Sequence, residues 1–79
     1  MKTNLDLATK LHYELNLDNF WTVSIRSYEV QLMGWHTPEL EKLLFDKGYQ
    51  LKWDELYGNY RFDENGVNII LSQKPKNDN

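Results

Sequence analysis

The stretch Trp21–His36, WTVSIRSYEVQLMGWH, alternates large apolar residues with polar ones and changes phase once in its middle. The apolar residues before Arg26 have odd numbers, and the first three after Ser27 have even numbers. In one continuous strand, the two sets would lie on opposite faces of a sheet. A hairpin places both sets on the same face, so the phase change predicts a turn in the middle of this stretch.

Two loop lengths fit this hairpin. A two-residue turn at Arg26–Ser27 pairs Val23 with Val30 and Trp21 with Leu32. Such a turn prefers glycine or asparagine, which arginine and serine do not supply. A four-residue loop, wider by one residue at each end, fits equally well in the same register.

Two other segments have helical periodicity. In residues 4–16 the apolar positions fall within about 100° on a helical wheel; they are Leu7, Ala8, Leu11 and Leu15. Thr37 and Pro38 are typical of the N-cap and the first residue of a helix. Gly48 can adopt a positive φ after a last turn, so this second helix is predicted to end at about Lys47.

Three more strands are predicted after the second helix. They are residues 49–53, 59–62 and 67–72, separated by turns at 55–58 and at 63–66 or Asn65–Gly66 alone. The element order is therefore α-β-β-α-β-β-β, and each strand has one apolar and one polar side. This pattern predicts a two-layer α+β fold, with an antiparallel sheet of four to five strands and two helices on one face.

The length of 79 residues favours one domain, predicted over residues 1–72. Residues 73–79 contain no apolar side chain, and we expect them to form a disordered tail. So small a domain buries little surface, and the absence of cysteine excludes disulfides. Eleven aromatic residues, three of them tryptophan, predict an aromatic-rich core instead.

The charge pattern and hydropathy limit the expected partners. Nine basic and twelve acidic residues give a net charge of −3, which argues against general binding to a phosphate backbone. The sequence contains no secretory signal and no apolar run long enough to cross a membrane. We expect a cytoplasmic protein without a membrane partner, in keeping with the lack of cysteine.

No motif for catalysis, metal binding or cofactor binding occurs. The chain lacks a glycine-rich phosphate loop, an HExxH motif and paired histidines at metal-ligand spacing. His12 lies at the margin of the apolar stripe of the first helix and His36 directly precedes the Thr37 cap, and at both positions a histidine at the boundary of the core is ordinary. We therefore expect no enzyme activity, no catalytic residue, no metal and no cofactor.

The remaining candidates lie on the predicted surface. Alternation places Phe20, Met33 and Ile70 among the polar residues of the outward sheet face, where a cluster would form a binding patch. The candidate partner-binding residues are Phe20, Met33, Trp35, Phe45, Ile70, Arg26, Lys52 and Arg61.

The predicted function is that of a small protein-interaction module, of adaptor or inhibitor type, that binds through its open sheet face or an edge strand. The partner is expected to be another protein or a second copy of the chain. The alternative is a single-stranded nucleic-acid-binding protein that uses the sheet face.

Overall fold

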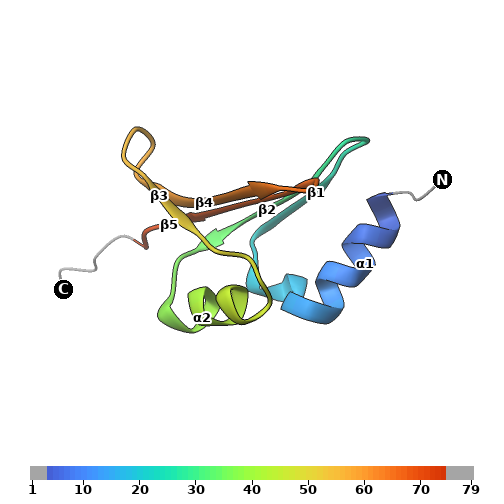
Figure 1. Ribbon diagram of the computed structural model, residues 1–79, viewed down its shortest axis with the longest axis horizontal. Coiled ribbons are helices and arrows are strands. Elements are labelled where there is room, and N and C mark those ends of the chain that lie inside the picture. Colours follow the sequence, from blue (N-terminus) through green and yellow to red (C-terminus); the bar gives the residue numbers. More distant parts are fainter. Residues whose placement is uncertain (1–3, 75–79) are drawn as a thin grey trace.

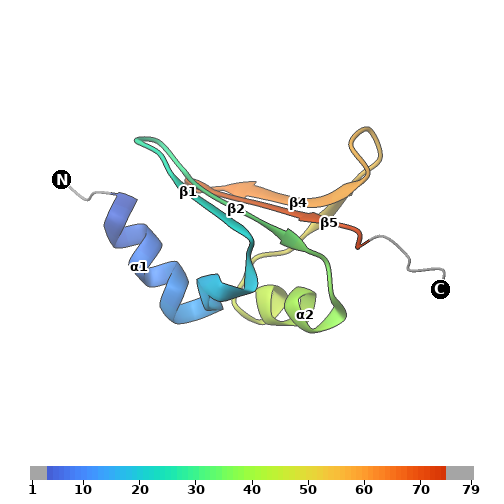
Figure 2. The same cartoon turned by 180° about the vertical axis from the view of Figure 1, so that it is seen from behind.

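A five-stranded sheet forms one layer of the structure, and two helices that lie on the same face of the sheet form the other (Figures 1 and 2). The computed structural model describes residues 4–74. Its helices are α1 (Asn4–Leu15), the 3-10 helix η1 (Leu17–Asn19) and α2 (Pro38–Asp46). Its strands are β1 (Thr22–Ile25), β2 (Val30–Trp35), β3 (Lys52–Asp54), β4 (Asn59–Glu64) and β5 (Val67–Ser72). The predicted α+β class and element order are confirmed.

The ends of α2 are set by the residues that the sequence indicated. The Thr37 side chain accepts a hydrogen bond from the Leu40 N–H at 3.1 Å, and Pro38 is the first helical residue. Gly48 has a φ of 94°. The Tyr49 N–H then donates to the Leu44 carbonyl at 2.8 Å, which completes a Schellman motif.

The sheet is mixed, so the expectation of a purely antiparallel sheet is wrong. The strand order is β1-β2-β5-β4-β3, and β2 runs parallel to β5 while the other pairs are antiparallel. As the central strand, β5 is buried on both faces over Ile69, Ile70 and Leu71. An uninterrupted apolar run of this kind is typical of a strand that is buried on both faces.

The β1–β2 hairpin has the predicted faces but a different register. Val23 lies opposite Leu32 instead of Val30, a shift of two residues. The loop is four residues long, from Arg26 to Glu29, and the Arg26 N–H donates to the Glu29 carbonyl at 2.8 Å. A shift of two residues preserves the side of each side chain, which is why the face assignment survives.

The other two hairpins agree with the sequence. Trp53 lies opposite Tyr60, as predicted. Between β4 and β5 the turn consists of Asn65 and Gly66 alone, with φ values of 54° and 79°. Two consecutive positive φ values are typical of the type I′ turn that asparagine and glycine favour.

The buried core is mainly aliphatic, in contrast to the predicted aromatic core. Its only aromatic members among the described residues are Phe20 and Phe62. All three tryptophans stay partly in solvent, with exposed fractions of 48% for Trp21, 39% for Trp35 and 44% for Trp53. Two helices of 12 and 9 residues cover the middle of the sheet and leave large side chains exposed at both of its edges.

Two further expectations concern the ends and hydropathy of the chain. Of the predicted disordered tail, residues 75–79 lie outside the described residues. In the described part of the chain, none of the helices has the length and apolar character needed to span a bilayer.

The positive φ of Gly48 predicts the effect of a substitution. Gly48→Val should lower the free energy of unfolding by more than about 1 kcal/mol, because a β-branched residue is strained in this region. Gly48→Asn is the matched control, since asparagine tolerates positive φ and should lose less. Urea denaturation followed by circular dichroism measures both, and equal stability of wild type and Gly48→Val would contradict the proposed C-cap.

Tyr49 also connects the two helices. Its hydroxyl donates a hydrogen bond to Glu14 Oε1 of α1 at 2.9 Å, and its ring meets Phe62 edge to face at 5.2 Å. Burial raises the pKa of Tyr49 from 10.0 to about 12, and the hydrogen bond to Glu14 and the charge of that carboxylate add to the effect.

This pKa predicts a loss of stability in alkali. Between pH 10 and 12 the unfolded chain releases the Tyr49 proton while the folded chain keeps it, so the free energy of unfolding should fall as pH rises through this window. Urea midpoints of wild type and Tyr49→Phe should converge there. A parallel pH dependence of the two proteins would show that Tyr49 does not carry the effect.

Candidate functional site

Four of the predicted partner-binding residues lie in one row across the sheet. Strand register places them side by side on the outer face, which is the face turned away from α1 and α2. This outer row consists of Lys52, Arg61, Ile70 and Met33, followed by Thr22 of β1. The sequence therefore identified residues that the fold brings together, but their exposure differs from the expectation.

Two of the predicted apolar contacts are buried. Phe20 is 8% exposed and packs in the core, so its placement on the outer face is wrong. It precedes β1 as the C-cap of η1, and the alternation of a strand does not extend to it. Ile70 does belong to the outer row but is only 7% exposed, between Met33 and Arg61.

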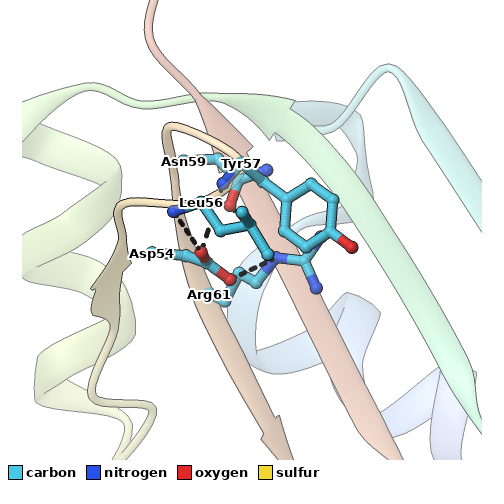
Figure 3. A network of polar contacts seen from close by, with 5 residues as sticks. All are labelled: Asp54, Leu56, Tyr57, Asn59 and Arg61. Carbon is cyan, nitrogen blue, oxygen red and sulfur yellow. Dashed lines mark hydrogen bonds and ion pairs between the residues drawn. The ribbon is translucent and has the colours of Figure 1, made fainter.

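Arg61 is held by groups of its own hairpin (Figure 3). Its Nε donates to Asn59 Oδ1 at 3.0 Å and lies 3.6 Å from Asp54 Oδ2. Its guanidinium lies 4.7 Å from the centroid of the Tyr57 ring. Asp54 in turn accepts hydrogen bonds from the N–H groups of Leu56 and Tyr57 at 2.9 and 3.2 Å, so the cluster closes the β3–β4 turn.

The other predicted charged and aromatic contacts are dispersed. Arg26 forms an ion pair with Glu29 at 3.5 Å and a hydrogen bond with Gln31 at 3.4 Å. Lys52 is exposed on the edge strand β3. Phe45 is exposed on α2, away from the outer row. Arg26 and Phe45 therefore lie apart from the outer row, which ends at Lys52.

A different feature stands out at the corner where η1 leads into β1 and β2 leads into α2. The rings of Trp21 and Trp35 meet there edge to face, with centroids 4.3 Å apart and planes inclined by 77°. Together with residues of η1 and α2 they line a hollow of about 530 Å³, which we call the tryptophan groove. Its lining is Asp18, Asn19, Phe20, Trp21, Trp35, Thr37, Glu39, Leu40 and Leu43.

Local packing fixes both walls of the tryptophan groove. A Cβ at Gly34 would lie 3.2 Å from the Asn19 carbonyl oxygen and from Cδ1 of Phe20, so any larger residue requires η1 to shift away from β2 by a few tenths of an ångström. The Asn19 side chain donates to the Leu15 carbonyl at 2.8 Å, which ties η1 to the end of α1. The opposite wall is α2, whose start is held by Thr37.

The charge of the tryptophan groove has one sign. Asp18 and Glu39 are its charged lining residues, and the lining contains no lysine, arginine or histidine. The hollow therefore combines two indole rings, which offer a negative π face to a cation, with two carboxylates.

An open strand edge begins at Trp21. β1 is the outermost strand and pairs only with β2 in the described sheet. Because Arg26 and Glu29 form a hydrogen-bonded pair, the alternation of an antiparallel ladder directs the N–H and C=O groups of Val23 and Ile25 away from β2. These groups and their partly exposed side chains are accessible to another strand.

The two edges of the sheet differ in protection. β3 has three residues, two of them charged, Lys52 and Asp54, which discourages pairing with another chain. β1 consists of Thr22 to Ile25 and carries no charge. By this criterion, β1 is the edge that favours strand addition.

Both histidines contact groups of their own chain. His12 Nδ1 accepts a hydrogen bond from the Leu17 N–H at 3.2 Å. The His36 ring stacks on Tyr60 with centroids 4.2 Å apart, and its Nε2 lies 2.5 Å from Glu41 Oε1. Within residues 4–74, no cluster of three histidine, cysteine or acidic side chains could hold a metal ion.

The comparisons with known proteins add no relative. No protein-family model matches the chain, and neither a curated protein nor a solved structure matches it. The case for a function therefore rests on the geometry of the chain itself.

The sequence interpretation included Trp35 but missed Trp21 as a surface residue. Strand alternation put Trp21 on the core side, but Trp21 lies outside β1, and its N–H donates to the Met33 carbonyl out of the register that pairs Thr22 with Met33. The usable signal in the sequence was Gly34. Its missing side chain leaves room for Phe20 in the core, while the neighbouring Trp21 packs against Trp35 at the surface.

The close approach at Gly34 predicts that a side chain here will be disruptive. Gly34→Val should lower the free energy of unfolding by about 1–3 kcal/mol, because the added atoms meet a backbone carbonyl that cannot move freely. Met33→Val, at the neighbouring position on the outer face, is the matched control and should be milder. Chemical denaturation compares them; a Gly34→Val protein as stable as the control would contradict the packing described.

Proposed function

We propose that this protein is a non-enzymatic protein-interaction module that binds an extended segment of another protein along β1 and into the tryptophan groove. The observation that carries the proposal is the exposure of Trp21 and Trp35 beside an uncharged open strand edge. A domain with so few core residues gains stability by burying tryptophan. Two tryptophans that stay exposed in one hollow can instead contribute binding energy when a partner buries them.

The geometry fits addition of a strand. An incoming extended segment would hydrogen-bond to the outward backbone groups of Val23 and Ile25. Its side chains on the helix side of the sheet would cover the exposed parts of these two residues. Next along the edge it would reach Trp21, and tryptophan is the residue type most enriched among those that dominate binding energy.

The arrangement gives less support to single-stranded nucleic acid as the ligand. Phosphate contacts on the outer face would need Arg26, Lys52 and Arg61. Arg26 and Arg61 already contact acceptors of their own chain, and Asp54 and Glu29 bring negative charge close to them. The net charge of −3 also opposes approach of a phosphate backbone.

Selection of peptides tests the proposal. A phage-displayed library of random dodecapeptides is selected on the wild-type protein, and the enriched peptides are measured by fluorescence titration. Trp35→Ala should weaken them about tenfold or more, as expected for a central tryptophan. Val23→Lys, which adds a charge to the open edge, should also weaken them.

Trp53→Phe is the matched control, because Trp53 has a similar exposure at the opposite edge of the sheet. It should leave peptide affinity unchanged. Enriched peptides that depend on Trp53 and not on Trp35, or failure to enrich any peptide, would overturn the proposal. So would micromolar binding of a short single-stranded oligonucleotide at physiological salt that is lost in Lys52→Ala.

The same edge also accommodates a second copy of the chain, so the oligomeric state is measured in parallel. Sedimentation velocity over a range of concentrations detects self-association. A dimer abolished by Val23→Lys would identify the partner as the protein itself and contradict a foreign segment as the occupant of β1.

A further inference from the structure

The tryptophan groove has a charge pattern that restricts what can enter it. Asp18 and Glu39 lie on its lining from opposite walls, η1 and α2. A partner that covers these carboxylates without supplying a positive charge removes them from water uncompensated, which is unfavourable. A partner that supplies a cation offsets this loss.

The two indoles favour the same kind of group. A guanidinium or an ammonium is attracted to the face of an aromatic ring, and tryptophan is the strongest of the aromatic residues in this respect. Because the planes of Trp21 and Trp35 are inclined by 77°, one ring can present its face to a group that contacts the edge of the other. The hollow of about 530 Å³ has room for a long side chain.

The position of the groove relative to β1 determines where along the partner this cation lies. The groove lies at the start of β1, where η1 leads into the strand, and α2 forms one of its walls. Trp21 directly precedes β1, and its N–H donates to the Met33 carbonyl at 2.9 Å, so the chain passes from the groove straight into the strand. A segment antiparallel to β1 therefore passes Ile25, Val23 and Trp21 in that order.

We propose that the partner segment carries two alternate apolar residues, whose side chains cover Ile25 and Val23, and after them a lysine or arginine whose side chain enters the tryptophan groove, next to Asp18 and Glu39. This inference rests on the proposed function and specifies its partner. The ligand class is an extended basic segment of a protein.

The geometry disfavours the other occupants of the groove. An acidic side chain would meet two carboxylates of the same sign. A purely apolar side chain would contact the indoles but leave both carboxylates without a counter-charge.

The experiment uses the peptides enriched in the dodecapeptide selection, measured against the full chain carrying Trp53→Phe. In this background Trp21 and Trp35 are the only tryptophans, so fluorescence reports on the groove alone. Each peptide is compared with a version in which its lysine or arginine is replaced by norleucine. The Asp18→Asn and Glu39→Gln variants keep the size of each side chain and remove its charge.

The expected result is a lysine or arginine shortly after the second apolar position in the enriched peptides. Replacement by norleucine should weaken binding by about threefold to thirtyfold, the range of a partly desolvated cation–π contact. Asp18→Asn and Glu39→Gln should each weaken the basic peptides and leave the norleucine peptides unchanged. Higher salt should reduce this difference, since the carboxylates lie near the surface.

The outcomes separate this inference from the proposed function. Enriched peptides that lack a cation but still depend on Trp35 would overturn the basic partner and leave the interaction module standing. Equal binding of basic peptides to wild type and to the charge-neutral variants would do the same. If no peptide depends on Trp35 or on the β1 edge, both the partner and the module are overturned.

Discussion

The parallel contact between β2 and β5 is the interaction on which the rest of the structure depends. It joins the β1–β2 hairpin to the β3–β4–β5 meander, and the inward side chains that meet there, Val30, Leu32, Ile69 and Leu71, are fully buried. Since β2 and β5 occupy the middle, β1 and β3 become the edges. The helices cover the middle first because the largest apolar area is there, and the edges retain exposed aromatic residues.

The elements were predictable from the sequence because their signals are local. Thr37, Pro38 and Gly48 define α2 through capping, which involves only neighbouring backbone groups. Asn65 and Gly66 define the last turn through their tolerance of positive φ. The order of strands in the sheet depends instead on which distant hairpins pair, and alternation within each strand contains no information about its neighbour. That explains why the parallel pair was missed.

For the strand residues of the candidate site, the sequence predicted the face of the sheet but not the exposure of the side chain. Strand parity placed Met33 and Arg61 on the outer face correctly, but it could not show that the Tyr57 turn folds over Arg61 or that Ile70 is enclosed by its neighbours. The tryptophan groove depends on tertiary placement of η1 against α2. A sequence gives the composition of such a corner, but not the placement of the surrounding elements that leaves Trp21 partly in solvent.

The charges of the chain add a physical reason for an asymmetric partner at β1. An uncharged edge strand accepts any extended chain, including its own copy, and edge protection by charge is present only at β3. Two copies of a chain with a net charge of −3 repel each other, whereas a basic segment is attracted both by the net charge and by Asp18 and Glu39 at the end of the edge. In the proposed complex, backbone pairing along β1 would supply affinity without sequence preference, and the acidic groove would discriminate among extended segments by charge.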